Sequence, residues 1–173
     1  CGPRINSKFT FDVLKPTGNK NGLMTIGAGS SAEILSGKGF IGAGDCGIYA
    51  DYGSTILANG AVFNTSRVSG IYAANNSSIV ANNAYVNNCD LNGIVAANNS
   101  NITANNIEAN NAGSRGIYSS SNSRVVANSA SLINSGNAAI SATNCSFVSA
   151  NSVNSTGSKS DGVYAIQGSE ISI

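Results

Sequence analysis

The sequence predicts an all-β fold: a right-handed, single-stranded parallel β-helix, a solenoid of about 23 residues and three short strands per coil. Three observations predict it. The chain repeats with a period of about 23 residues, apolar columns alternate with polar ones inside short segments, and asparagine stands at a fixed place in each repeat. Composition agrees, because 42% of the residues are hydrophobic and the net charge is only +1. Disordered chains are typically poor in hydrophobic residues and rich in net charge.

The repeat becomes visible when the chain is written with one repeat to a row. The rows start at Gly47, Gly70, Gly93, Gly116, Ala139 and Gly162. A shorter row that begins at Thr25 precedes them, and it places Ile26 in the column of Ile48. Each row holds three short segments, for example residues 70–73, 78–82 and 84–87. Segments of this length are too short for the helices of a helical solenoid, so we expect strands.

Three columns carry the predicted core. The second column is Ile48, Ile71, Ile94, Ile117, Ile140 and Val163. The tenth column is Ile56, Ile79, Ile102, Val125, Val148 and Ile171. The twelfth column is Ala58, Ala81, Ala104, Ala127 and Ala150. Each alternates with other residues along its segment, as a strand with one buried face requires.

Two polar columns predict the corners. The thirteenth column is Asn59, Asn82, Asn105, Asn128 and Asn151. Asparagine tolerates the left-handed backbone conformation, and its amide can bond to the next coil. The eighth column is Ser54, Ser77, Ser100, Ser123, Ser146 and Ser169, whose hydroxyls can satisfy the turn backbone. Right-handed winding is the default for parallel crossover connections.

The domain prediction has two parts. Residues 25–173 form the β-helix, and residues 1–24 form an entry segment or an irregular first coil, with a strand expected at residues 8–13. The chain starts at Cys1 rather than Met and stops at Ile173 in the middle of a row, so we expect it to be a fragment of a longer protein.

Composition also excludes several kinds of function. A net charge of +1 argues against a nucleic-acid partner, and no apolar run approaches the roughly 18 residues of a membrane span. The chain has no histidine, which excludes Ser–His and Cys–His nucleophiles and makes a zinc site improbable. We expect no metal and no cofactor. The cysteines, interpreted as small buried hydrophobic residues, are Cys1, Cys46, Cys89 and Cys145.

Rows of the form Gly-Ile-Tyr-Ala, Asn-Asn-Ser-x-Ile and Ala-Asn resemble the β-helical repeats of bacteriophage tail spikes and tail fibres, over residues 25–173. The resemblance implies a homotrimer at the virion surface, or otherwise outside the cell, that meets host polysaccharide and other virion proteins. Many such spikes degrade capsule or O-antigen. Bacterial adhesins and autotransporter passengers are the nearest competitors. Pectate-lyase-like enzymes share the fold, but fold alone does not determine function.

The third column is the first candidate binding surface. It carries Tyr49, Tyr72, Tyr118 and Tyr164, interrupted by Val95 and Ser141. Neighbouring strand residues face opposite sides, so these tyrosines point outward if Ile48 points inward. Exposed tyrosines offer flat apolar faces with polar tips, suited to sugar rings or to a partner chain. Plain aromatic stacking on a sheet or a subunit interface is the simpler interpretation.

The second candidate is a ladder of Asp45, Arg67 and Asp90. Arg67 and Asp90 share a column, and Asp45 lies one row earlier if the shorter row is gapped suitably. Carboxylates two coils apart are separated by about 9–10 Å, near the upper limit for an inverting glycosidase. Arg67 would keep both ionised, whereas a general acid needs a raised pKa. We therefore expect a solvated salt-bridge ladder.

Three functions follow for testing. The first is a structural and receptor-binding shaft that contacts host surface polysaccharide without catalysis. The second is a polysaccharide depolymerase, either a hydrolase or a lyase, and the third is an adhesin or autotransporter passenger. The scarcity of charged clusters and the absence of histidine favour the first.

Overall fold

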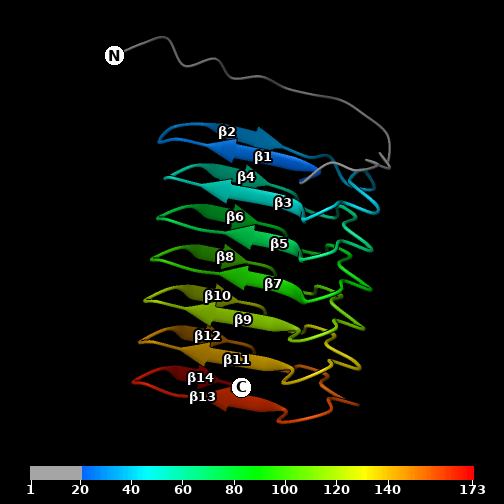
Figure 1. Ribbon diagram of the computed structural model, residues 1–173, viewed down its shortest axis with the longest axis vertical. Helices are drawn as coiled ribbons and strands as arrows, with labels where there is room; N and C mark the ends of the chain where they lie inside the picture. Colours follow the sequence, from blue (N-terminus) through cyan, green and yellow to red (C-terminus); the bar gives the residue numbers. More distant parts are fainter. Residues whose placement is uncertain (1–20) are drawn as a thin grey trace.

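The computed structural model describes residues 21–173, and these form a parallel β-helix of seven coils (Figure 1). The described residues contain strands, turns and bends but no α-helix. Strands from successive coils stack into two seven-stranded parallel sheets. The predicted fold class is therefore confirmed. The strand expected at residues 8–13 lies outside the described residues.

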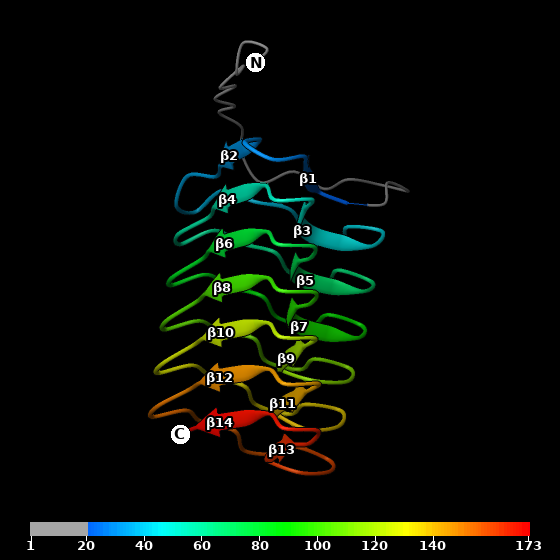
Figure 2. The ribbon, with the colours of Figure 1, turned by 90° about the vertical axis from the view of Figure 1, so that its left-hand side faces the viewer.

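The two sheets take alternate strands of the chain. The odd sheet contains β1 (Leu23–Ile26), β3 (Cys46–Asp51), β5 (Ser69–Ala73), β7 (Asn92–Ala96), β9 (Ile117–Ser120), β11 (Ile140–Thr143) and β13 (Val163–Ala165). The even sheet contains β2 (Ser31–Glu33), β4 (Thr55–Leu57), β6 (Ser78–Val80), β8 (Asn101–Thr103), β10 (Arg124–Val126), β12 (Phe147–Ser149) and β14 (Glu170–Ser172). Figure 2 shows the two stacks side by side along the same axis.

The third predicted strand of each coil is reduced to a single residue, which forms an isolated parallel β-bridge with the neighbouring coil. The bridged residues are Gly39, Val62, Tyr85, Glu108, Ser131 and Asn154. Turns close on both sides of them: Asn83 and Asn88, with φ of 57° and 60°, flank Tyr85. Left-handed residues turn the chain, so little extended backbone is left between them.

The register predicted for the first coil is wrong. Leu23, not Ile26, pairs with Ile48, and Ile26 is 52% exposed. Further along the same coil, Ser31 pairs with Thr55 and Gly39 pairs with Val62. The number of residues between paired positions in the first and second coils therefore falls by one from each strand to the next. The first coil therefore carries one extra residue at each of two corners. The first strand accordingly begins within the stretch that the sequence pattern assigns to the entry segment.

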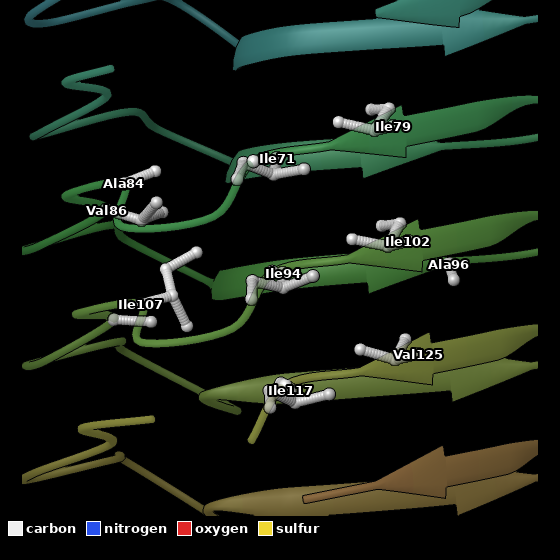
Figure 3. Close-up of a cluster of buried hydrophobic side chains, with 14 of the residues drawn as sticks. Ile71, Ile79, Ala84, Val86, Ile94, Ala96, Ile102, Ile107, Ile117 and Val125 are labelled. Carbon is white, nitrogen blue, oxygen red and sulfur yellow. The ribbon is translucent and has the colours of Figure 1, made fainter. Parts of the chain in front are cut away.

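The aliphatic columns fill the interior as predicted. The second, tenth and twelfth columns are at most 1% exposed from Ile48 through Ala150. Figure 3 shows Ile71, Ile94 and Ile117 stacked in one row on the odd sheet and Ile79 in a second row on the even sheet. Complete burial of an aliphatic side chain contributes about 1.5–3 kcal/mol, and here the contribution repeats in each coil.

The corner ladders also form. In the thirteenth column the Oδ1 of each asparagine from Asn59 to Asn128 accepts the backbone N–H of the asparagine one coil later, as Asn82 does from Asn105 at 2.9 Å. The left-handed conformation falls on the following residue, for example Asn83. In the buried eighth column, the Ser100 Oγ accepts the N–H of Ser77 at 3.2 Å. These bonds satisfy backbone donors at the corners, which are costly to leave unpaired when buried.

Packing requires glycine at four of the row starts, Gly47, Gly70, Gly93 and Gly116. A Cβ on Gly70 would lie 1.9 Å from a methyl group of Val86. Val86 lies in the same coil, on its third face, the side where successive coils are joined by single β-bridges such as that of Tyr85. Gly47 and Gly116 meet Phe63 and Leu132 in the same way. The one row that starts with alanine, at Ala139, has a smaller residue, Ser155, at the matching position.

Gly70→Ala is expected to lower the free energy of unfolding by roughly 1–2 kcal/mol, because the core is already close-packed there. In a Val86→Ala background the same change should cost less, since the methyl group it meets is gone. Gly162→Ala, whose Cβ would meet only Ser155 Oγ at 3.9 Å, is the matched control. Chemical denaturation measures all four variants. Equal costs of Gly70→Ala in both backgrounds would contradict this packing explanation.

Candidate functional site

The tyrosine column lies on the outer face of the odd sheet, as predicted. In β3, Ile48 and Ala50 are fully buried, whereas Tyr49 is only half-buried. Strand pairing aligns the column as Met24, Tyr49, Tyr72, Val95, Tyr118, Ser141 and Tyr164. The structure therefore presents these side chains along one line parallel to the helix axis.

The column is not one continuous aromatic strip. Tyr49 and Tyr72 form an edge-to-face pair with ring centroids 5.1 Å apart. Val95, only 5% exposed, separates them from Tyr118. Tyr118 carries the guanidinium of Arg115 over its ring, 4.6 Å from the centroid. The tyrosines thus fall into two groups along the axis.

The first group borders a pocket of about 310 Å³, here called pocket A. Its lining residues are Asn21, Asp45, Cys46, Tyr49, Val68 and Tyr72. The Asn21 Oδ1 accepts the backbone N–H of Cys46 at 3.1 Å, which ties the preceding chain to β3. Pocket A therefore combines two aromatic side chains, one carboxylate and one amide.

The second group borders a pocket of about 290 Å³, here called pocket B. Its lining residues are Arg115, Asn137, Ala138, Asp161 and Tyr164. It again contains a tyrosine, a carboxylate and an amide, with one guanidinium added. Tyr118 lies beneath that guanidinium and lines neither pocket.

Asp51 holds the aromatic pair of pocket A in place. Asp51 is 6% exposed, and its carboxylate accepts a hydrogen bond from the Tyr49 hydroxyl at 3.0 Å. It also accepts the Asn75 side-chain amide at 2.7 Å and the Tyr52 backbone N–H at 2.9 Å. Burial, and then the bond to Asp51, raise the pKa of Tyr49 well above its ordinary value. Burial likewise raises the pKa of Tyr72, so both phenols stay neutral at physiological pH.

The predicted Asp45–Arg67–Asp90 ladder is not formed as a set of ion pairs. Across residues 21–173 no nitrogen–oxygen contact within 4.0 Å joins Arg67 to either carboxylate. Arg67 and Asp90 are both exposed, where an ion pair gains little in water. Asp45 instead lines pocket A, and the other two line neither pocket. The three residues therefore do not make one site.

Two of the three described cysteines are buried, as expected. Cys46 and Cys89 are 4% and 1% exposed, and burial raises their pKa to about 12 and about 11. Cys145 is exposed, at a left-handed turn position with φ of 59°. Cys1 lies outside the described residues.

These shifts predict a loss of stability at high pH. The thiol of Cys46 has an ordinary pKa of 9.0, so the unfolded chain releases this proton first as the pH rises. The contribution of the buried thiols is complete below pH 9.0 and is lost as the pH approaches their folded values of about 11 and about 12. Denaturation at a series of pH values measures this. A Cys46→Ala/Cys89→Ala variant should lose less stability over the same interval, and an identical slope would contradict the assignment.

Acidic and sulfur-bearing side chains are dispersed along the rod. In the part of the chain that the structure describes, no three His, Cys, Asp or Glu side chains gather closely enough to hold a metal ion. Within the same residues no helix is long and apolar enough to cross a membrane.

Sequence reasoning missed the polar walls of both pockets: Asn21, Arg115, Asn137 and Asp161. These residues do not recur as a column, so periodicity gives them no signal. Their common feature is position, since each lies one or two residues before a row start or, for Asn21, at the equivalent place in the first coil. That place adjoins the tyrosine column on the same outer face.

The comparison with protein families agrees with the architecture. The family described as "Right handed beta helix region" matches residues 18–173, nearly the whole chain, and its handedness is the one predicted from connection rules. No curated protein matches the sequence. The chain belongs to the right-handed β-helix family.

Proposed function

We propose that this β-helix is a receptor-binding shaft of the tail-spike or tail-fibre kind, which contacts host surface polysaccharide through the tyrosine column of the odd sheet. The observation that carries the proposal is pocket A, where Tyr49 and Tyr72 present aromatic surface beside the carboxylate of Asp45 and the amide of Asn21. Aromatic faces stack on the apolar side of sugar rings, and carboxylate and amide groups bond to sugar hydroxyls.

The scaffold supports this role. Seven stacked coils make a rigid rod, and strand register holds the tyrosines on its outer face. Side chains on such strands already have their final positions before a ligand binds. Less conformational entropy is therefore lost on binding. The proposal extends to a homotrimer with other virion proteins at the virion surface, or to another extracellular setting.

A depolymerase remains the second candidate because Asp45 lines an aromatic pocket. Its predicted partner Asp90 does not line that pocket, and within residues 21–173 no second carboxylate does. The two-carboxylate mechanism of most glycosidases needs a pair across the scissile bond. Binding without cleavage is therefore the proposal. The adhesin or autotransporter alternative uses the same surface and differs in what the rod is attached to.

The test is a polysaccharide array that holds capsule and O-antigen preparations together with uncharged mannan, xylan, galactan and β-glucan and with acidic polygalacturonate, alginate and hyaluronan. We expect retention of the protein by at least one polymer, and a loss of up to roughly tenfold in affinity for Tyr72→Ala, since an aromatic stacking contact contributes about 0.5–1.5 kcal/mol. Tyr85→Ala, an exposed tyrosine on the third face, is the matched control.

Three results would change the proposal. Equal retention of Tyr72→Ala and the native protein would move the site elsewhere. Retention by no polymer would refute glycan binding. Shortening of the retained polymer, abolished by Asp45→Asn, would replace the binding shaft with the depolymerase. Sedimentation of the protein tests the trimer, and a monomer at micromolar concentration would contradict it.

A further inference from the structure

Pockets A and B occupy the same place in the coil. Each lies between a third-column tyrosine and the residues one or two places before a row start, on the outer face of the odd sheet. Cys46 in pocket A and Ala138 in pocket B stand in the same column, four repeats apart. Coils stack at about 4.8 Å, so the two pockets lie about 19 Å apart along the helix axis.

The path between the pockets carries no charge. In these columns the coils between Asp45 and Arg115 contribute Ser69, Asn92 and Val95, among other uncharged side chains. Val95 and Ser69 are at most 5% exposed, whereas Leu91, in the column of Asp45, is 47% exposed and adds apolar surface to the path. The charged residues Arg67 and Asp90 stand one place further from the row start and line neither pocket. An extended ligand can therefore follow the axis from one pocket to the other.

The charges inside the pockets indicate which kind of chain fits. Among the described residues that line it, pocket A contains Asp45 and no cationic side chain. Pocket B contains Asp161 as well as Arg115, so its formal charges cancel. A polymer with a carboxylate on each sugar would place negative charge against Asp45, and no cation from residues 21–173 lines the pocket to offset it. Like charges brought together in this way weaken binding.

On the basis of the proposed glycan-binding function, we infer that the ligand is a linear, uncharged polysaccharide that lies parallel to the helix axis and occupies pockets A and B at once. Each pocket, near 300 Å³, is at the small end for ligand sites and holds only a short part of such a chain. Joining two weak contacts through one ligand raises the overall affinity by about 10²–10⁴-fold when the ligand spans both.

The test uses size-graded fragments of the four uncharged polymers on the array and of polygalacturonate as the acidic comparison, with affinity measured by calorimetry. We expect a steep rise in affinity, on the order of 100-fold, at the fragment length that first spans both pockets. Tyr164→Ala should remove this rise, because it takes away the tyrosine of pocket B. Melting curves of the variant establish that its coils remain folded.

A coil deletion gives a second and independent readout. Removing residues 82–104 takes out one full repeat in frame, joins Ala81 to Asn105 and keeps every side chain that lines either pocket. The pockets then stand three coils apart instead of four, about 14 Å. The fragment length at which affinity rises should shorten by about a quarter, which a purely structural role for the deleted coil does not predict.

The outcomes separate this inference from the proposed function. Short fragments that bind through Tyr72 with no rise in affinity at greater length would overturn the two-pocket inference and leave glycan binding standing. A threshold length unchanged by the deletion, or tighter binding of polygalacturonate than of every uncharged polymer, would overturn it as well. No binding by any fragment would overturn both.

Discussion

Ile94→Ala is expected to lower the free energy of unfolding by about 2–5 kcal/mol, the range for truncating a fully buried aliphatic side chain. Ile94 is 0% exposed and lies in the central strand β7, between Ile71 and Ile117 of the neighbouring coils (Figure 3). Both neighbours are themselves fixed in sheet register, so neither can move far to fill the cavity. Denaturant unfolding followed by circular dichroism measures the loss.

Leu91→Ala in the same coil is the control, because Leu91 is 47% exposed and its truncation leaves no cavity. We expect it to stay within about 0.5 kcal/mol of the native protein. In a solenoid each coil contacts mainly its neighbours, so Ile94→Ala should also speed hydrogen exchange most in β5, β7 and β9. Equal losses for the two variants would contradict the assignment of the second column to the core.

Asp51→Ala is expected to cost about 1.5–3 kcal/mol and to weaken glycan binding. The change removes a buried carboxylate that accepts three hydrogen bonds, from Tyr49, Tyr52 and Asn75, and it leaves those donors without their acceptor. Tyr49 then loses the bond that orients its ring against Tyr72. Unfolding measurements give the first effect, and affinity for the retained polysaccharide gives the second.

Asp51→Asn separates the roles of shape and charge. The asparagine side-chain oxygen can still accept hydrogen bonds. Its NH₂ group cannot accept any, so it would face a donor that one carboxylate oxygen of Asp51 satisfies in the native protein. We expect stability and binding between those of the native protein and of Asp51→Ala. If Asp51→Ala unfolds less readily than Asp51→Asn, or binds polysaccharide as tightly as the native protein, Asp51 does not position the aromatic pair.

Most of the fold could be predicted because the same pattern of apolar and polar residues recurs in each coil. Each core column is stated five or six times in the sequence, and the constant period fixes which residues stack. The first coil is different. The sequence pattern makes its row one residue shorter than the repeat, whereas the coil is two residues longer, so Ile26 is placed three residues from Leu23, the true partner of Ile48. The third strand of each coil shrinks to one bridged residue because turns close on both sides, which alternation alone does not reveal.

The site was predictable only in part, for a related physical reason. The tyrosines recur in one column, and alternation correctly turns them outward. The polar walls of the pockets occur once each, so no repeated column marks them. Spacing relates Asp45 to Asp90, but its place in the structure is beside Tyr49 and Tyr72. The pockets combine residues from different columns and different coils, and spacing within one column does not reveal which of these lie side by side.

The most direct test of glycan contact on the odd sheet is an NMR titration of the ¹⁵N-labelled protein with a ten-sugar fragment of the polysaccharide that the array retains best. We predict chemical-shift changes in the backbone amides of β3, β5 and β13 and of the residues just before them, in a line along the helix axis. Changes confined to the even sheet, for example at Asn101, Arg124 and Phe147, or no changes at saturating ligand, would contradict the account.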